Sequence, residues 1–160
     1  MTQRRAAATP SNLQIVPPAS CTDPGWLSLR AGLWPGVAAH ELLRDMEESS
    51  ARGHFVRLAC LHGGNAVGFI EAAQRNDYVN GTSSSPVVFL EELYVEPAAR
   101  RQGVARALVA EVERWAADRA CSELASDSPI GNLVAHAMHR ALGFEETERV
   151  LYFRRAVRLR

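Results

Sequence analysis

The sequence predicts an α/β fold with a mixed β-sheet, and three observations support this prediction. Short runs of aliphatic and β-branched residues alternate with longer segments of helical periodicity. One of these runs, residues 87–95, passes through a basic turn into an amphipathic helix. The 160 residues amount to one domain, and no internal repeat appears along them.

Composition narrows the class of protein. Hydrophobic residues make up 47% of the chain and charged residues 22%, so the chain is not disordered throughout. The formal net charge of zero gives no global basic field for nucleic acid, and no apolar run is long enough to span a membrane. The first 18 residues lack the apolar core of a signal peptide. These features predict a cytoplasmic protein with neither nucleic acid nor membrane as a partner.

The cysteines give no sign of a metal site. Cys21, Cys60 and Cys121 are odd in number and lack the spacing of metal ligands. We therefore expect reduced, buried thiols and no metal ion. Cys60 lies within an apolar run, where a small core residue fits.

The N-terminal half is expected to contain two helices and a hairpin. Residues 1–11 are predicted to be a flexible tail ahead of a single domain, residues 12–160, which begins with a short strand around residues 13–16. Asp23 and Pro24 begin a helix that ends at Leu33, because proline is acceptable as the first helical residue. The Pro35-Gly36 pair separates it from a second helix at residues 38–52. A hairpin follows, made of residues 54–61 and 66–75 about a Gly-Gly-Asn turn.

A central strand and a helix are expected next. A polar loop, residues 80–85, precedes the strand of residues 87–95, which Glu91 and Glu92 interrupt and Pro97 ends. The helix that follows has one apolar face at helical spacing, formed by Val104, Leu108, Val112 and Trp115. Beyond it we expect a strand at residues 121–126, a helix from Ser128-Pro129, and one or two strands within residues 144–157.

The turn between the central strand and its helix has the properties of a phosphate site. The first N–H groups of a helix lack intrahelical partners, and the helix dipole makes this end partly positive. Gly103 lets the backbone approach a ligand closely, and Arg100, Arg101 and Arg106 add formal charge. Such a turn should hold a pyrophosphate. A P-loop would need a Gly-rich run closed by Lys and Ser or Thr, and a dinucleotide fingerprint would need three spaced glycines, which the sequence lacks here.

Residues 100–105, Arg-Arg-Gln-Gly-Val-Ala, resemble the acyl-CoA pyrophosphate loop of the GNAT superfamily of N-acetyltransferases. Residues 93–97 are similar to the preceding strand, whose backbone pairs with the pantetheine arm in that family. Asn132 and the segment 142–144 resemble the later helix and its exit. The resemblance implies the GNAT fold, a mixed central β-sheet with a splay between its two central parallel strands and with flanking helices. It also implies acetyl-CoA as co-substrate, bound by Leu93, Tyr94, Val95, Arg100, Arg101, Gln102, Gly103, Val104, Ala105, Arg106 and Asn132.

Longer segments resemble the aminoglycoside 6′-N-acetyltransferases, most of all the chromosomal type of enteric and related bacteria. The similarity extends over residues 13–155 and includes residues 33–36, 77–81, 85–91, 125–127 and 142–150. It implies direct transfer of the acetyl group of acetyl-CoA to the 6′-amino group of aminoglycoside antibiotics, antibiotic resistance and a homodimer. Two alternatives remain open: another small-polyamine or peptide N-acetyltransferase on the same fold, and a non-catalytic acyl-CoA-binding module.

An aminoglycoside is a polyamine, so its site should present carboxylates and an aromatic wall. The resemblance implies substrate contacts at Trp34, Tyr78, Glu91, Asp127 and Glu148. Structural alternatives exist, because Trp34 and Tyr78 can pack in the protein, Glu91 can be an edge-strand charge and Asp127 can begin a helix. A regular strand turns Glu91 and its neighbour to opposite faces, but a bulge would disturb this alternation, so parity does not choose between the two acids.

Catalysis by direct transfer needs no covalent enzyme intermediate, because the protein mainly positions donor and amine. Glu91, a bound water or a backbone carbonyl could accept the proton of the amine. Many superfamily members have Tyr four residues before the Gly of the Gly-Phe pair, as a proton donor to the departing thiolate. His139 occupies this position here, and it either donates that proton, contacts CoA or packs.

Overall fold

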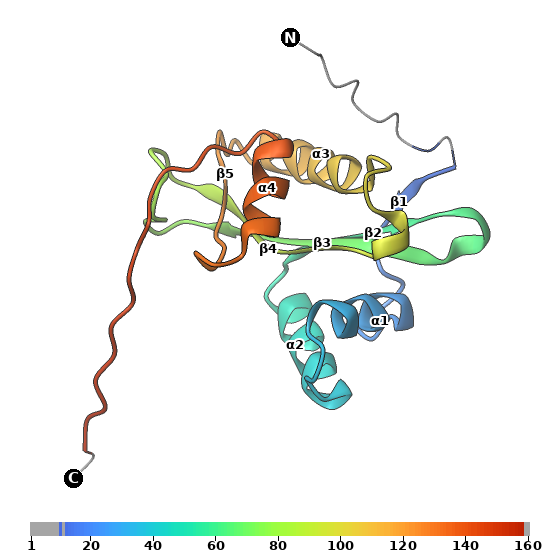
Figure 1. Ribbon diagram of the computed structural model, residues 1–160, viewed down its shortest axis with the longest axis horizontal. Coiled ribbons are helices and arrows are strands. Elements are labelled where there is room, and N and C mark those ends of the chain that lie inside the picture. Colours follow the sequence, from blue (N-terminus) through green and yellow to red (C-terminus); the bar gives the residue numbers. More distant parts are fainter. Residues whose placement is uncertain (1–9, 11, 159–160) are drawn as a thin grey trace. The chain divides into compact units, whose positions relative to one another are not determined.

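One five-stranded sheet forms the centre of the first part of the chain. The computed structural model describes residue 10 and residues 12–158, and in these residues the strands lie across the sheet in sequence order (Figure 1). The first four strands pair antiparallel, and the fifth runs parallel to the fourth. The strands are β1 (Gln14–Val16), β2 (Phe55–Cys60), β3 (Ala66–Arg75), β4 (Val87–Val95) and β5 (Leu124–Ser126). The predicted mixed sheet is confirmed.

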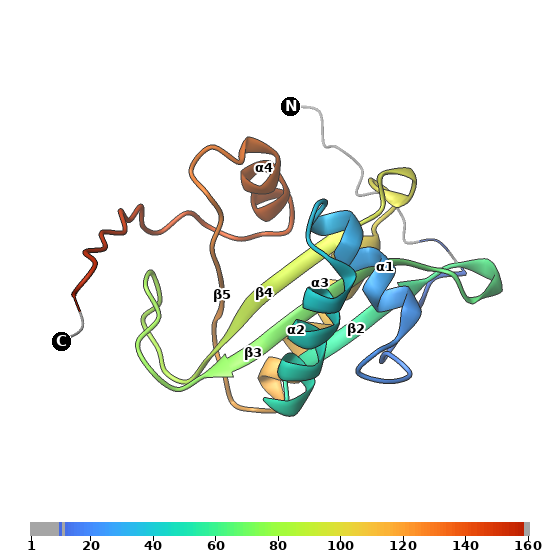
Figure 2. The ribbon, with the colours of Figure 1, turned by 90° about the horizontal axis from the view of Figure 1, so that it is seen from below.

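The chain divides into two compact units, residues 1–127 and residues 128–160. In the first unit, α1 (Pro24–Leu33) and α2 (Ala39–Ala51) lie on one face of the sheet, and α3 (Val104–Ala117) lies on the other (Figure 2). The sequence predicted α1 and α2 within one residue at each end, and it predicted a helix after Gly103. Both faces of the sheet are therefore covered, as an α/β fold requires.

Each face of the sheet has its own apolar packing. Trp26 of α1, Met46 of α2 and Phe69 of β3 are fully buried in one cluster. On the α3 side, the predicted apolar face is confirmed, because Val104, Leu108 and Val112 are buried and the ring of Trp115 lies 4.9 Å from that of Phe55. Burial of this kind supplies most of the driving force that keeps the sheet rigid beneath a site.

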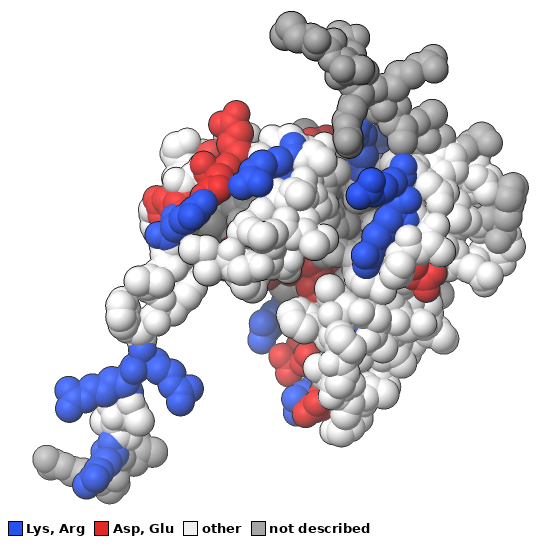
Figure 3. Space-filling model, in the orientation of Figure 1, with Lys and Arg blue, Asp and Glu red and all other residues white. Residues whose placement is uncertain are grey.

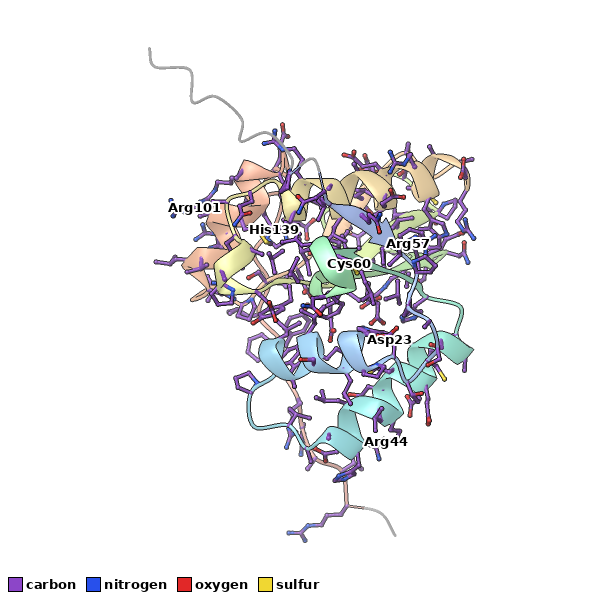
Figure 4. The ribbon with its side chains drawn as sticks, turned by 90° about the vertical axis from the view of Figure 1, so that its right-hand side faces the viewer. Asp23, Arg44, Arg57, Cys60, Arg101 and His139 are labelled. Carbon is purple, nitrogen blue, oxygen red and sulfur yellow. The ribbon has the colours of Figure 1, made fainter. Side chains whose placement is uncertain are left out.

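The start of α1 is fixed by Asp23 (Figure 4). Its Oδ1 accepts hydrogen bonds from the N–H groups of Gly25 at 2.8 Å and Trp26 at 3.1 Å, and its Oδ2 accepts one from Ala19 at 2.8 Å. These bonds satisfy donors that the helix itself leaves without partners. The cap thereby anchors the helix that carries buried Trp26.

Asp23→Ala is expected to lower the free energy of unfolding by about 1–2 kcal/mol, because the capping acceptor is lost. Asp23→Asn keeps an amide oxygen in the same place and is expected to keep most of the stability. Denaturant unfolding of both variants measures the difference. Equal stability of the alanine variant and the parent protein would contradict the capping role.

A β-bulge interrupts the pairing of the two longest strands. Glu71 lies opposite Glu92 and the next residue, Ala72, lies opposite Leu90, so Glu91 is an extra residue in β4. The strand is nevertheless continuous through both glutamates. The side chains of a regular strand alternate between its two faces, but this alternation does not hold at Glu91 because of the bulge. Alternation alone therefore does not decide which face Glu91 and Glu92 point to.

The second unit differs from the sequence prediction. Its helix α4 (Leu133–Ala141) begins four residues later than Pro129, after a turn in which the N–H of Asn132 donates to the carbonyl of Pro129 at 2.9 Å. The strands expected within residues 144–157 are absent from the described part of the chain, and Leu151 and Phe153 are 82% and 91% exposed. A strand needs a neighbour to pair with, and local residue preference does not supply one.

Three further expectations are tested only in part. All three cysteines are free, but only Cys60 and Cys121 are buried; Cys21 lies exposed in the loop before α1, so its predicted burial is wrong. Burial raises the pKa of the Cys60 thiol, and the nearby Asp23 adds to this.

The predicted tail, residues 1–11, lies outside the described residues except for residue 10. Among described helices, none has the length and apolar character to cross a membrane.

Candidate functional site

The predicted phosphate turn has the backbone that an anion site needs. After β4, the short 3₁₀ turn Pro97–Ala99 leads into Arg101 and Gly103, which have φ angles of 61° and 82°. Gly103 is the N-cap of α3 and provides no side-chain hydrogen bond to it. The first N–H groups of α3 therefore have no side-chain cap, so they can donate to an anion.

Side chains of the turn have two different roles. Arg100 Nε donates to the carbonyl of Val95 at 2.9 Å, and Gln102 Nε2 donates to that of Ala98 at 2.9 Å, so both side chains hold the loop in shape. Arg101 and Arg106 are exposed and, among described residues, form no ion pair. Arginine side chains gather on this face of the protein (Figure 3), and Arg101 projects from its surface (Figure 4). This charge, next to exposed amides, fits a pyrophosphate.

The strand before the turn has an open edge. β5 pairs with β4 only at Val88, Phe89 and Leu90, so the two parallel strands separate where the bulge begins. This separation is the predicted splay. The side chains of Tyr94 and Val95 pack in the protein, and the expected contact of Leu93, Tyr94 and Val95 with a ligand would therefore use their backbone.

Two grooves lie beside the bulge in the first unit, and the second of them is rich in acidic residues. The larger, of about 730 Å³, is lined in part by Arg52, His54, Arg75, Asp77 and Glu91. The second shares Arg52, His54 and Glu91 with it and adds further carboxylates, those of Asp45, Glu48, Glu71 and Glu92. Carboxylates outnumber guanidinium groups in the second groove, whereas the two are equal in number in the larger one, so the second groove suits a cationic ligand best.

The two neighbouring glutamates of β4 have different partners. Glu91, at the bulge, pairs with Arg75 at 2.8 Å and keeps 24% of its side chain exposed. Glu92 is more deeply buried; it forms an ion pair with Arg30 at 3.0 Å and accepts a hydrogen bond from Trp34 Nε1 at 2.9 Å. Burial raises the pKa of Glu92, although Arg30 and Trp34 oppose the rise. Glu91 thus retains the accessibility that substrate binding needs.

Glu92→Gln is expected to flatten the pH dependence of stability. Because the folded pKa of Glu92 lies above the usual 4.5, the folded state binds its proton more tightly, and stability falls as the pH rises from 4.5 through the folded pKa. Ionised Glu92 therefore destabilises the fold at neutral pH, and the glutamine variant should lose less stability over that window. Denaturant unfolding at a series of pH values measures this slope.

Glu123→Gln is the control for this experiment, because the pKa of Glu123 shifts in the opposite direction. Hydrogen bonds from Ser84 and Ser83 lower it. Ionised Glu123 therefore contributes stability above its unfolded pKa, and that stability is lost as the pH falls through the folded value. If Glu92→Gln lost stability with rising pH more steeply than the parent protein, the raised pKa of Glu92 would be contradicted.

The two candidate aromatic residues are not core residues. Trp34 follows α1 and is 47% exposed, and Tyr78 lies in the loop between β3 and β4 and is 73% exposed. The packing alternatives for both are therefore wrong. Asp127 is also exposed, directly after β5, and it does not begin α4, whose N-cap is Asn132.

The other predicted site residues lie in the second unit and are described within it. Asn132 Oδ1 accepts the N–H of Ala135 at 3.1 Å, which accounts structurally for an amide side chain at this position. His139 Nδ1 lies 2.8 Å from the carbonyl of Ala135, and its ring meets that of Phe144 edge-on at 5.3 Å. Glu148 is exposed and lies outside any helix or strand.

Sequence reasoning missed a buried polar network at the grooves. Glu71 of β3 is 2% exposed, and its carboxylate contacts Arg30 Nη1 at 2.9 Å and His54 Nδ1 at 2.8 Å. The sequence feature that could have indicated this network is a glutamate inside the apolar run of β3. A buried charge without a partner is costly there, so partners for Glu71 were to be expected. Among described residues, no group of three or more His, Cys, Asp or Glu side chains could hold a metal ion.

Comparison with known proteins identifies the family. Residues 24–144 match the Acetyltransferase (GNAT) family. The aminoglycoside N(6')-acetyltransferase type 1 of Stenotrophomonas maltophilia is 54% identical over 130 residues, which cover 81% of this chain and 84% of that relative.

Solved structures agree with this assignment. The aminoglycoside antibiotic 6'-N-acetyltransferase AAC(6')-Ih from Acinetobacter baumannii has a TM-score of 0.84 at 43% identity, covering 91% of this chain and 99% of that one. AAC(6')-Iy, solved in complex with the bisubstrate analog CoA-S-monomethyl-acetylneamine, has a TM-score of 0.83 at 42% identity, covering 92% of this chain and 100% of that one. The chain therefore belongs to the acetyltransferase (GNAT) family.

Proposed function

We propose that this protein is an aminoglycoside 6′-N-acetyltransferase. It transfers the acetyl group of acetyl-CoA directly to the 6′-amino group of aminoglycoside antibiotics, which releases CoA and confers resistance. One observation supports this most strongly: β4 connects a cationic turn, whose helix has no side-chain cap, to an acid-rich groove that its bulge residue Glu91 lines. The relative AAC(6')-Iy binds a CoA–neamine bisubstrate analog, which joins the same two kinds of ligand.

Acetyl-CoA is bound by the strand and turn. The amides of Gly103, Val104, Ala105 and Arg106 donate to the pyrophosphate, and Arg101 and Arg106 neutralise its charge. Arg100 and Gln102 keep the loop in the required shape. The open β4 edge at Leu93, Tyr94 and Val95 pairs with the pantetheine arm, and the family resemblance adds Asn132 as a contact of acetyl-CoA.

The antibiotic binds along the acid-rich surface. Trp34 and Tyr78 form its aromatic wall, and each cation over an aromatic face gains about 0.5–2 kcal/mol. Glu91, Asp127 and Glu148 pair with ammonium groups. Glu91 also acts at the reacting amine as base or through a water, and the family resemblance makes His139 the candidate proton donor to the thiolate.

Positioning accounts for most of the rate. Bound acetyl-CoA supplies a thioester that an amine can attack without a covalent enzyme intermediate. The chain holds the acceptor by several ion pairs next to bound acetyl-CoA. The entropy loss of bringing the two reactants together therefore occurs on binding and does not add to the barrier of the chemical step. The amides near the bulge can stabilise negative charge on the carbonyl oxygen.

Assembly and location are part of the same proposal. The apolar side chains of Leu151, Tyr152, Phe153 and Val157 are each more than 80% exposed, and surface of this kind is favourable to bury. A homodimer in which a second copy covers them would satisfy this segment, and light scattering tests it. The family match spans residues of both compact units, in keeping with a single catalytic domain in residues 12–160. We place the enzyme in the cytoplasm, where acetyl-CoA is available.

Thiol release from acetyl-CoA tests the function. Kanamycin or tobramycin should start release, and NMR of the product should place the acetyl group on the 6′-nitrogen. Polyamines and peptide N-termini serve as comparison acceptors. A higher kcat/KM for either would favour the alternative that aminoglycosides are side substrates, and no release with any acceptor would favour a binding module.

A further inference from the structure

His54 is a titratable side chain of the grooves to which neither the family resemblance nor the proposed function assigns a role. It precedes β2, lines both grooves and shares them with Glu91. Its side chain is 17% exposed, so it is partly shielded yet open to the groove. An acceptor amine held at Glu91 would therefore lie in the same groove as this imidazole.

The contacts of His54 fix its tautomer. Nδ1 lies 2.8 Å from Glu71 Oε1, and an ionised carboxylate only accepts hydrogen bonds, so Nδ1 carries the proton. Arg30 Nη1 donates to the other oxygen of Glu71 at 2.9 Å, which holds that carboxylate in place. Nε2 forms no hydrogen bond with any described residue. Neutral His54 thus presents the Nε2 lone pair.

We propose, on the basis of the proposed function, that His54 accepts the proton of the acceptor's ammonium group at Nε2, directly or through one water. Glu71 and Arg30 are positioning residues that orient the ring. A base held by a buried carboxylate is a recurrent arrangement for proton transfer. It gives the reaction a second proton acceptor beside Glu91, whose carboxylate already pairs with Arg75.

Charged groups from every neighbouring element surround this imidazole. The carboxylates of the two grooves are Asp45 and Glu48 of α2, Glu71 of β3, Asp77 of the following loop, and Glu91 and Glu92 of β4. The guanidinium groups are those of Arg30, Arg52 and Arg75. The excess of carboxylates attracts ammonium groups.

The proton and electron balance is simple. The ammonium gives one proton to Nε2, and the freed nitrogen lone pair forms the C–N bond as the carbonyl π pair moves to oxygen. The pair on oxygen then re-forms the carbonyl double bond as the C–S bond breaks. The electrons of the C–S bond leave with sulfur as the CoA thiolate. The nitrogen's second proton neutralises the thiolate, and imidazolium returns its proton to water. One proton is released for each acetyl group transferred.

His54→Gln tests the proposal, because glutamine can still donate to Glu71 but cannot accept a proton near neutral pH. We expect kcat to fall about 100-fold or more, with unchanged acetyl-CoA affinity in calorimetry. The acidic limb of the pH profile due to imidazole should disappear, and the residual rate should rise with pH as the free amine forms. Added imidazole should restore activity to His54→Ala about 10-fold. His40→Gln, which changes an exposed histidine of α2, is the matched control and should leave activity unchanged.

The outcomes separate this proposal from the function it rests on. No turnover by the parent protein contradicts the proposed function itself. Turnover by the parent, with His54→Gln within about threefold of it and an unchanged pH profile, overturns only the role of His54. Loss of acetyl-CoA affinity together with kcat, without rescue by imidazole, also overturns it. Nitrogen NMR of the parent should find the Nδ1–H tautomer of His54, and the Nε2–H tautomer would contradict the proposal independently of turnover.

Discussion

Gly103→Val is expected to weaken acetyl-CoA binding at least about 100-fold. Gly103 has φ 82°, where a β-branched residue is strongly disfavoured, so the turn before α3 must rearrange. Rearrangement would move the amides that we propose to bind the pyrophosphate, and each charge-assisted hydrogen bond that is lost costs about 1.5–3 kcal/mol. Two such bonds account for the predicted loss, since 1.4 kcal/mol is about a factor of ten. Isothermal calorimetry with CoA measures it.

Gly63→Val is the matched control for this change. Gly63 also has φ 82°, in the turn between β2 and β3, and a Cβ placed there meets nothing within 4 Å. The two variants should lose comparable stability through backbone strain, but only Gly103→Val should lose CoA affinity. Equal affinity of both variants for CoA would contradict the assigned phosphate site.

Glu91→Gln is expected to lower kcat/KM for aminoglycosides about 10- to 100-fold, with little change in acetyl-CoA binding. The substitution preserves shape but removes the charge that we propose to pair with a substrate ammonium, and a charged hydrogen bond contributes about 1.5–3 kcal/mol. It also leaves Arg75, the partner of Glu91 at 2.8 Å, as an unbalanced positive charge beside the groove. Steady-state kinetics with tobramycin measures the effect.

Glu111→Gln controls for the loss of an ion pair as such. Glu111 pairs with Arg114 on α3 and lines neither groove, so this variant should keep the kinetics of the parent. Similar losses in donor and acceptor affinity for Glu91→Gln would count against its role as a substrate contact.

Local sequence signals were sufficient for most of the first unit. The Asp23-Pro24 start, the helical spacing of Val104, Leu108 and Val112, and the glycine turn at residue 103 each act through neighbours in the chain, and the structure confirms them. The shape of the turn before α3 was predictable for the same reason, because its glycine and its arginines are contiguous in the chain, whereas its role as a phosphate site stays a prediction.

Features that depend on partners distant in sequence were not predictable. The bulge at Glu91 arises from a register shift opposite Glu71 and Ala72, and no local pattern specifies it. The contact of His54 with Glu71 depends on a different strand pair, because it needs β2 to pair with β3. The late start of α4 follows from the cap at Asn132, which outweighs the Ser-Pro signal upstream. The strands expected within residues 144–157 lack any pairing neighbour in the described chain.

A crystal structure of the protein with CoA and tobramycin tests the central claim most directly. We predict that the pyrophosphate lies against the amides of residues 103–106, and that the pantetheine arm follows β4 toward the bulge. The 6′-amine should lie in the acid-rich groove, within reach of Glu91 and of His54 Nε2. A nucleotide bound away from Gly103, or an antibiotic bound outside the groove, would contradict this account.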